Sequence, residues 1–356
     1  MNKYALLLKT GESELRAIDN LNLPDGLLPI IELTRGRKSK SDSIGDLSKK
    51  IKKIESNFHD REIILDLTND SNLSNIQIDN LFDPQNGYEN WLSFLSEQAS
   101  KNKFRRIIPS ILVNTKDENL ETNLQKQASS LSQNFKSIAY RCDIEDEGCI
   151  DDIHAIGKIL NYCESHIIID CGYIIPSDVN RCAERAAFLI NQIHEIVPNA
   201  FFIMTSTSFP DKLPDEDNGF SIRLSEIDLY NNLVKRFDNI SIIYGDYGSI
   251  NPIRNDNIFL SRGWRPRIDI PLQNEIYYYR RRRDLMDYST TYSFVAREAY
   301  EDSRFPKKMD SNWGINQIIN AANGAAPGAS PSFWISVRMN IYIEQQLRRL
   351  RLFKYT

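Results

Sequence analysis

The stretch SIIYGDYGSINP, residues 241–252, decides the fold of this chain. Its apolar residues 242–244 favour a buried strand, and they lead directly into Gly245 and Asp246. Glycine and aspartate are common turn residues, so a plain turn would account for them. The alternative is a set of parallel strands whose last residues face one shared site, and the rest of the chain has to distinguish the two.

Apolar runs of strand length recur along the chain, with helix-like segments between them. The runs are short, β-branched and apolar on both faces, as is typical of parallel strands covered by helices. The intervening segments carry apolar residues at three- and four-residue spacing, which indicates amphipathic helices. The predicted strands are residues 4–9, 27–34, 61–68, 104–113, 137–143, 166–173, 199–208 and 240–248.

Strict strand–helix alternation implies a parallel sheet with right-handed crossovers. Eight such units within residues 1–250 match the size of a (β/α)8, TIM-like barrel. The competing fold, an open doubly wound sheet, would usually carry a glycine-rich turn after its first strand. The turn here, KTGESE at residues 9–14, has a single glycine. We therefore predict an α/β fold with a TIM-like barrel over residues 1–250.

The pattern changes beyond residue 250. RIDIPL at 267–272 and EIYYYRRR at 275–282 predict a β-hairpin, and Pro271 suits an edge strand. Two helical segments follow, and the chain ends on a long amphipathic helix at 333–353. We predict that residues 251–356 form a hairpin and helical extension packed on the barrel.

Composition and charge exclude several classes of protein. The chain is 41% hydrophobic with a net charge of −4, so no overall field attracts nucleic acid or anionic lipid. Its five cysteines include no C-x-x-C pair, which favours buried free thiols in a reducing cytosol. No run approaches the ~18 apolar residues of a membrane span. We expect a soluble, cytoplasmic protein that does not associate with membranes.

Acidic residues end several of the predicted strands. Side chains alternate along a strand, so only every second residue faces a barrel interior. We expect five carboxylates to meet at the C-terminal face of the barrel, where barrel enzymes build their sites. These residues are Glu32, Asp66, Asp143, Asp170 and Asp246. The alternative is structural, because aspartate also ends strands when it begins a turn or caps a helix.

A ring of buried carboxylates needs a cation, shared protons or basic partners. A hard divalent ion such as Mg²⁺ or Mn²⁺ suits oxygen ligands, and the predicted ligands are Glu32, Asp66, Asp170 and Asp246. Basic residues would instead neutralise the ring or bind a phosphate on the substrate. The candidates are Lys9, Arg35, Arg37 and Arg141.

The run RRRR, Arg280–Arg283, is a second candidate site. It has the composition of a nucleic-acid-binding patch. In a strand, however, its side chains would divide between two faces, and a solvated edge is the alternative.

Segments along almost the whole chain resemble one known family. They include YALLLKTGESELRAIDNL, HIIIDCG, FFIMTSTSFPDKL, IIYGDYGSINP, IYYYRRRR, DSNWGINQIINAA and the helix that carries Trp334. Together they are similar to the beta protein family, which phages and satellite phages encode. The resemblance implies a role associated with a phage or mobile element, in defence of the host against other phages. It implies no catalytic mechanism, but it places Asp246 and Tyr247 in the most recognisable segment.

Two functions stay open from the sequence, and whether the chain is an enzyme is one of the open questions. In the first, the barrel is a hydrolase of phosphodiesterase type, metal-assisted or not, acting on a phosphorylated or nucleotide substrate. Its acid–base or metal-binding groups are Asp246, Asp170, Glu32 and Asp66, and its substrate-binding groups are Lys9, Arg35, Arg141 and Tyr247. In the second, the barrel is a scaffold, sensor or regulator. It would bind a protein of the same operon, or a phage protein, through the hairpin, Arg280–Arg283 and the terminal helix.

Overall fold

The computed structural model describes residues 4–40, 42–213, 218–253 and 263–352. Parallel strands form one sheet in the order β4-β3-β2-β1-β9-β7-β6-β5. These are β1 (Tyr4–Lys9), β2 (Leu27–Leu33), β3 (Glu62–Leu67), β4 (Arg106–Pro109), β5 (Ser137–Asp143), β6 (Glu164–Tyr173), β7 (Phe201–Thr207) and β9 (Ile242–Asp246). Every predicted barrel strand is present.

The two edge strands of this sheet, β4 and β5, approach one another and nearly close it into a barrel. Ser110 and Ala139 form an isolated parallel bridge between the end of β4 and β5. The backbone N–H of Ile111 donates to the carbonyl of Ala139 at 2.8 Å. The sheet is therefore a TIM-like barrel, and the predicted fold class is confirmed.

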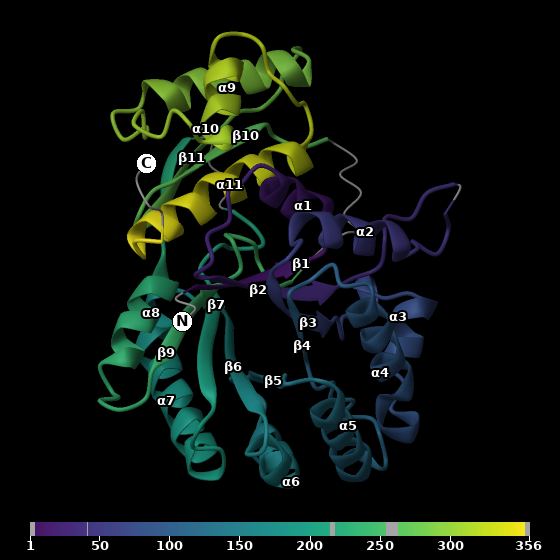
Figure 1. The fold of residues 1–356 in the computed structure, drawn as a ribbon. Coiled ribbons are helices and arrows are strands. Elements are labelled where there is room, and N and C mark those ends of the chain that lie inside the picture. The colour runs from purple at the N-terminus through teal and green to yellow at the C-terminus, as the bar shows by residue number, and fades with distance from the viewer. Residues whose placement is uncertain (1–3, 41, 214–217, 254–262, 353–356) are drawn as a thin grey trace.

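Helices follow the strands and cover the outside of the barrel (Figure 1). They are α1 (Glu12–Asp19), α2 (Ser48–Asn57), α3 (Ile76–Leu81), α4 (Gln85–Ser100), α5 (Leu120–Asn134), α6 (Cys149–Leu160), α7 (Val179–Ile196) and α8 (Ser225–Val234), with short 3-10 turns at Ser71–Leu73 and Pro176–Asp178. Each amphipathic helix buries its apolar face against the outward-facing residues of the strands. Within the described ranges, none of the helices combines the length and apolar character of a bilayer span.

The inside of the barrel has its own apolar core. Leu7, Ile64, Ile168 and Ile203 belong to a cluster that lies within the strands. On the same faces, toward the C-terminal ends, the next side chains are polar. The alternation that fills the barrel with aliphatic side chains therefore also sets the phase of the site above it.

The C-terminal extension contains a second, antiparallel sheet with the order β10-β11-β8. The hairpin of β10 (Arg267–Pro271) and β11 (Glu275–Arg280) confirms the prediction, although β11 ends two residues before the predicted strand. The third strand, β8 (Asn218–Arg223), was not predicted and comes from the connection between β7 and α8. The extension's sheet thus takes one strand from before residue 250. The predicted division of the chain at that residue stays a prediction.

Among the described residues of the extension, the hairpin is followed by the helices α9 (Tyr288–Glu301), α10 (Trp313–Ala322) and α11 (Pro331–Arg349). Helix α11 lies between the barrel and the rest of the extension (Figure 1). Its Asn340 amide donates to the carbonyls of Ala17 and Asn20 at the end of α1, at 3.0 and 2.9 Å. On another face, Arg338 pairs with Asp269 of β10 at 3.0 Å, so α11 joins the two parts of the chain.

Candidate active-site pocket at the mouth of the barrel

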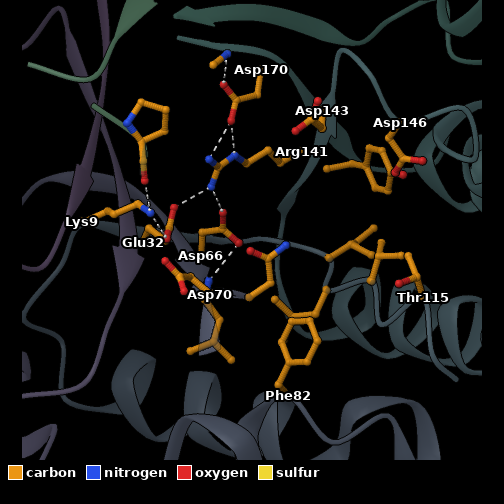
Figure 2. A pocket seen from close by; sticks show the side chains of 18 of the residues that line it. Lys9, Glu32, Asp66, Asp70, Phe82, Thr115, Arg141, Asp143, Asp146 and Asp170 are labelled. Carbon is orange, nitrogen blue, oxygen red and sulfur yellow. Dashed lines mark hydrogen bonds and ion pairs between the residues drawn. The ribbon is translucent and has the colours of Figure 1, made fainter. Parts of the chain in front are cut away.

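A cavity of about 450 Å³ opens at the C-terminal ends of the barrel strands. Figure 2 shows side chains from several strands pointing into it. Its polar lining includes Lys9, Glu32, Asp66, Asp70, Asp143, Asp146, Asp170, Arg141 and Tyr247, and its apolar lining includes Phe82, Ile111, Leu112 and Val113. The predicted site face therefore carries a pocket.

The guanidinium of Arg141 lies at the centre of the polar lining (Figure 2). Its Nε and Nη2 donate to Asp170 Oδ2 at 2.9 and 2.7 Å. Its Nη1 donates to Glu32 Oε2 at 2.8 Å and to Asp66 Oδ2 at 3.2 Å. Tyr247 adds its hydroxyl, which lies 3.2 Å from Nη2 and 2.6 Å from the Asp170 carboxylate. Carboxylates from three strands thus bind one cation.

Strand register brings these side chains together. Lys9 pairs with Glu32 across β1 and β2, and Glu32 pairs with Asp66 across β2 and β3. On the other side of the barrel, Asp143 pairs with Asp170 across β5 and β6. Paired residues of parallel neighbours point to the same face. Since those faces continue the aliphatic interior, the polar residues meet above it.

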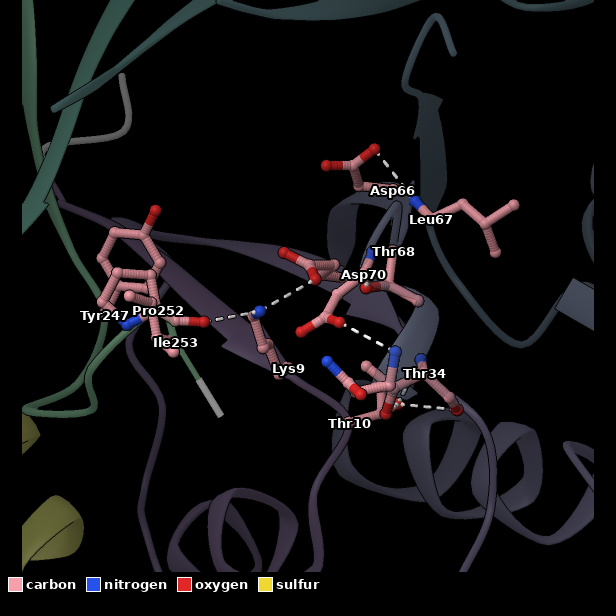
Figure 3. A network of polar contacts seen from close by, with 12 residues as sticks. Lys9, Thr10, Thr34, Asp66, Leu67, Thr68, Asp70, Tyr247, Pro252 and Ile253 are labelled. Carbon is pink, nitrogen blue, oxygen red and sulfur yellow. Dashed lines mark hydrogen bonds and ion pairs between the residues drawn. The ribbon is translucent and has the colours of Figure 1, made fainter. Parts of the chain in front are cut away.

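Lys9 supplies the second cation of the pocket. Its Nζ lies 3.4 Å from Glu32 Oε1 and donates to the carbonyl of Pro252 at 2.8 Å (Figure 3). The side chain is buried. Glu32 is therefore held between two cations, whereas Asp66 forms one ion pair among the described residues, with Arg141.

The two neighbouring carboxyls differ in their tendency to ionise. Burial raises the pKa of Glu32, but Arg141 and Lys9 outweigh it and hold that pKa below its ordinary value. Burial also raises the pKa of Asp66, and the negative charge of Glu32 raises it further. Arg141 lowers this pKa only in part, so the net shift is upward. The pocket thus sets one carboxyl toward the ionised form and its neighbour toward the protonated form.

Arg141 stays charged in this setting. Burial alone would lower its pKa, but Asp170, Tyr247, Glu32 and Asp66 together raise the pKa well above the ordinary value. A charged guanidinium therefore occupies the space between the carboxylates. Across the part of the chain that the structure describes, no three or more His, Cys, Asp or Glu side chains are arranged to hold a metal ion. The residues present do not fit the predicted Mg²⁺ or Mn²⁺ site.

Asp246 does not join the pocket, in contrast to the prediction. In β9, Ile243 faces the barrel interior, so Tyr244 and Asp246 face outward. The Asp246 carboxylate accepts hydrogen bonds from the Tyr4 hydroxyl at 2.8 Å and from the Gly248 N–H at 2.8 Å. The prediction grouped the residues of this face correctly but assigned the face to the wrong side of the sheet.

Two other predicted groups also lie elsewhere. Arg35 is absent from the residues that line the cavity, and it donates to the carbonyls of Asn72 and Gly36, each at 3.2 Å. Arg280 is buried within the hairpin, opposite Arg267. Lys9, Arg141 and Tyr247 do line the pocket, but each is already engaged with residues of the site.

The sequence reasoning missed the contributions of the loops. Asp70 follows β3, and Phe82 ends helix α3. Asp146 follows β5, in the turn where the N–H of Gly148 donates to its carboxylate at 2.9 Å. The acidic run of residues 143–147 was a usable signal, because a run of carboxylates directly after a barrel strand lies at the site face.

The fold and site define this chain as a TIM-like barrel protein with a buried ionic pocket at its mouth. The model of the Beta protein family matches residues 4–348, and the chain belongs to that family. It is 29% identical over 360 residues to Protein beta of Enterobacteria phage P4, covering 99% of this chain and 95% of that protein. The resemblance found in the sequence is thereby confirmed.

Solved structures show weaker likenesses. The spore cortex-lytic enzyme SleL of Bacillus megaterium QM B1551 is 13% identical, with a TM-score of 0.34, covering 95% of this chain and 74% of SleL. A chitinase of Chromobacterium violaceum ATCC 12472 is 10% identical, with a TM-score of 0.32, covering 96% of this chain and 99% of the chitinase. Likenesses of this size carry no argument about activity.

Proposed function

We propose that this chain is a phage-associated barrel enzyme that hydrolyses a polar substrate without a metal ion, with Glu32 and Asp66 as its acid–base pair. The observation that carries the proposal is that Arg141 Nη1 lies 2.8 Å from Glu32 Oε2 and 3.2 Å from Asp66 Oδ2 in the cavity at the strand ends. The opposite directions of the two pKa shifts agree with it. Pairs of titratable groups whose surroundings separate their pKa values are how one site supplies both an acid and a base.

Each carboxyl has a definite role in this proposal. Glu32 acts in its ionised form and accepts a proton from the attacking water, and Asp66 acts in its protonated form, which its raised pKa favours, and donates a proton to the leaving group. Arg141 positions both side chains and favours the ionised form of Glu32. Asp170 and Tyr247 hold Arg141 in place from the opposite side.

The charge of the pocket indicates the class of substrate. Of the described residues that line the cavity, six carry carboxyl groups and two, Lys9 and Arg141, carry cationic groups. Both cations already bind carboxylates, so neither offers a phosphate a vacant partner. The lining therefore favours a neutral or cationic polar substrate over the phosphorylated or nucleotide substrate expected from the sequence.

The biological role that we propose is defence of a bacterial host against other phages. Family membership and the phage relative support the association with phages, and the defence role is the part that we propose. The test is to express the chain in a phage-sensitive bacterium and count plaques of challenging phages. We expect fewer plaques with the wild-type chain, and no reduction with Glu32→Gln or Asp66→Asn when the variant accumulates in soluble, folded form.

A second hypothesis is that the chain is a scaffold that binds a partner protein or nucleic acid, and a separate observation supports it. The arginines at 281–283 are exposed, and the side chain of Leu285 beside them is fully exposed. Arg283 lies 4.7 Å from the centre of the Tyr288 ring. An exposed cationic and apolar surface of this kind suits docking of a protein or nucleic acid.

The same plaque assay distinguishes the two readings. If the chain is a scaffold, reversing the charges at 281–283 to glutamate abolishes protection, while Glu32→Gln and Asp66→Asn retain it. If the chain is a hydrolase, the pocket variants lose protection and the surface variant keeps it. Added chelator leaves a purified metal-independent enzyme unaffected, whereas turnover that requires Mg²⁺ or Mn²⁺ would contradict the proposal.

A further inference from the structure

A second group of buried acids lies outside the pocket, where the barrel meets the C-terminal extension. It consists of Glu226 on α8, Asp246 on β9 and Tyr342 on α11, and we call it the carboxyl bridge. The three side chains are almost completely buried, with exposed fractions of 1%, 0% and 0% in that order. Buried carboxyls are costly unless they are hydrogen-bonded or share protons, so this group requires an explanation.

The hydrogen bonds of the carboxyl bridge require a shared proton. The Tyr342 hydroxyl oxygen lies 2.8 Å from Glu226 Oε1 and 3.1 Å from Asp246 Oδ2. A phenol has one hydrogen to donate, so it serves only one of the two carboxylates. The second contact is a hydrogen bond only if that carboxyl carries a proton and donates it to the Tyr342 oxygen.

The other partners indicate where this proton lies. Asp246 Oδ1 already accepts from the Tyr4 hydroxyl and from the Gly248 N–H, which favours its ionised form. Glu226 accepts from the Ser208 hydroxyl through Oε2, so its Oε1 is available to carry hydrogen. The consistent arrangement is a protonated Glu226 that donates to Tyr342, which in turn donates to Asp246.

Titratable and charged groups near the bridge come from β1, β9, α8 and α11. Tyr4 comes from β1, Tyr244 from β9 and Tyr230 from α8. Arg349 of α11 is a cation on this side, with its guanidinium 4.3 Å from the centre of the Tyr244 ring. Burial raises the pKa of Glu226 to about 7 and that of Asp246 to about 6, in agreement with the shared proton.

We propose that the carboxyl bridge is a proton-dependent set of hydrogen bonds that holds helix α11, and with it the extension, against the barrel. Loss of the shared proton leaves two ionised carboxylates beside one hydroxyl in a buried space, and like charges at that distance repel. Because Asp246 also holds the Gly248 N–H, the bridge further anchors the turn that carries Tyr247 into the pocket. This proposal does not depend on the pocket being catalytic.

The direction of the pH effect follows from the raised pKa values. A carboxyl whose pKa is higher in the folded state stabilises that state at low pH, and this contribution is lost as pH rises through the folded value. This contribution is therefore fully present below the unfolded-state values of about 4 and is lost as pH rises through the folded values of about 6 to 7.

Hydrogen exchange of the full chain, followed by mass spectrometry at pH 5.5 and pH 8 and corrected for intrinsic exchange rates, tests the proposal. We expect protection of α11, relative to α5, to fall at least about tenfold at pH 8, since one pKa unit corresponds to a tenfold change. Glu226→Gln should remove this pH dependence, because the amide donates to Tyr342 and its oxygen still accepts from Ser208. Glu195→Gln, an exposed change on α7, should leave the pH dependence intact.

Equal protection of α11 at both pH values, or unchanged pH dependence in Glu226→Gln, would overturn the proposal. If Glu226→Gln does not fold, infrared spectroscopy of the wild-type chain decides the question. The Asp66→Asn variant is measured beside the wild-type chain, because Asp66 is also proposed to carry a proton. A carboxylic acid band that is present in both at pH 5.5, resists exchange with solvent, and disappears by pH 8 supports the bridge. Absence of any such band at pH 5.5 contradicts it.

Discussion

Arg141 binds the Asp170 carboxylate through two nitrogens, with Nε at 2.9 Å and Nη2 at 2.7 Å from the same oxygen. The pair joins neighbouring strands β5 and β6 at the mouth of the barrel. It also directs the third nitrogen, Nη1, toward Glu32 and Asp66 across the barrel. One guanidinium therefore neutralises the carboxylates, which is the alternative to a divalent metal ion that the sequence left open.

Replacing Arg141 by methionine should destabilise the fold by about 3 kcal/mol, because it leaves buried carboxylates without their counter-ion. Urea denaturation at pH 7 measures this loss. The loss should shrink as pH is lowered toward 4, since protonation removes the unpaired charges. As a control, Arg181→Ala breaks an ion pair with Glu145 in which both side chains are 61% exposed, and should cost less than about 1 kcal/mol. Equal losses in the two variants would contradict the central role of Arg141.

Glu32→Gln and Asp66→Asn should affect stability in opposite ways, although the residues are neighbours. Glu32 has a lowered pKa, so its charge stabilises the fold above its unfolded-state value, and Glu32→Gln should cost about 1–3 kcal/mol at pH 7. Asp66 has a raised pKa, so its stabilisation is lost as pH rises, and Asp66→Asn should leave the melting temperature at pH 7 unchanged or higher. Thermal melts at pH 5 and pH 7 check both. A large loss in Asp66→Asn at pH 7 would contradict the assignment.

Gly245→Ala should destabilise the barrel by about 1–3 kcal/mol. A Cβ at this position would lie 2.8 Å from the Met204 carbonyl oxygen and 3.1 Å from the Ala5 carbonyl oxygen, both of them backbone atoms of flanking strands. Gly148→Ala is the matched control, because its Cβ would meet only a side-chain oxygen of Asp146 at 3.3 Å. Chemical denaturation of both variants measures the difference. Similar stability of the two variants would contradict the close packing of β9 against its neighbouring strands at residue 245.

Asp246, in the opening stretch, shows how far the sequence could predict the site. The rhythm of apolar runs was sufficient for the barrel, and alternation within strands placed Glu32, Asp66, Arg141 and Asp170 on one face. Alternation alone does not say which face is inside, so Asp246 was placed on the wrong side of its strand. Only contacts with Tyr4 and Tyr342, which lie far away in the sequence, reveal its true surroundings.

Other features depended on long-range contacts that periodicity cannot report. Strand β8 forms by pairing with β11, and no local signal distinguishes it from a loop. In the sequence, Arg35 cannot be distinguished from an arginine that binds phosphate. In the structure, it donates to backbone carbonyls and does not line the pocket. The sequence left both a metal ion and neutralisation by basic residues open, because it does not reveal that Arg141 reaches three carboxylates at once.

Tyr247→Phe should leave the fold intact but loosen Arg141. The Tyr247 hydroxyl contacts both Asp170 and Arg141, at 2.6 and 3.2 Å, and it is a neutral partner in a charged network. We expect a loss of about 1 kcal/mol in urea denaturation and weaker protection against plaques. A variant with unchanged stability and full protection would show that the hydroxyl has no part in holding the network.

The central claim is that Glu32 is ionised and Asp66 is protonated more readily, beside one charged arginine. Carbon-13 NMR of the side-chain carboxyls, assigned with Glu32→Gln and Asp66→Asn and titrated from pH 3 to pH 8, measures both groups directly. The account predicts that Glu32 titrates below the ordinary glutamate value and Asp66 above the ordinary aspartate value. Titration of both groups at their ordinary values, or in the reverse order, would contradict it.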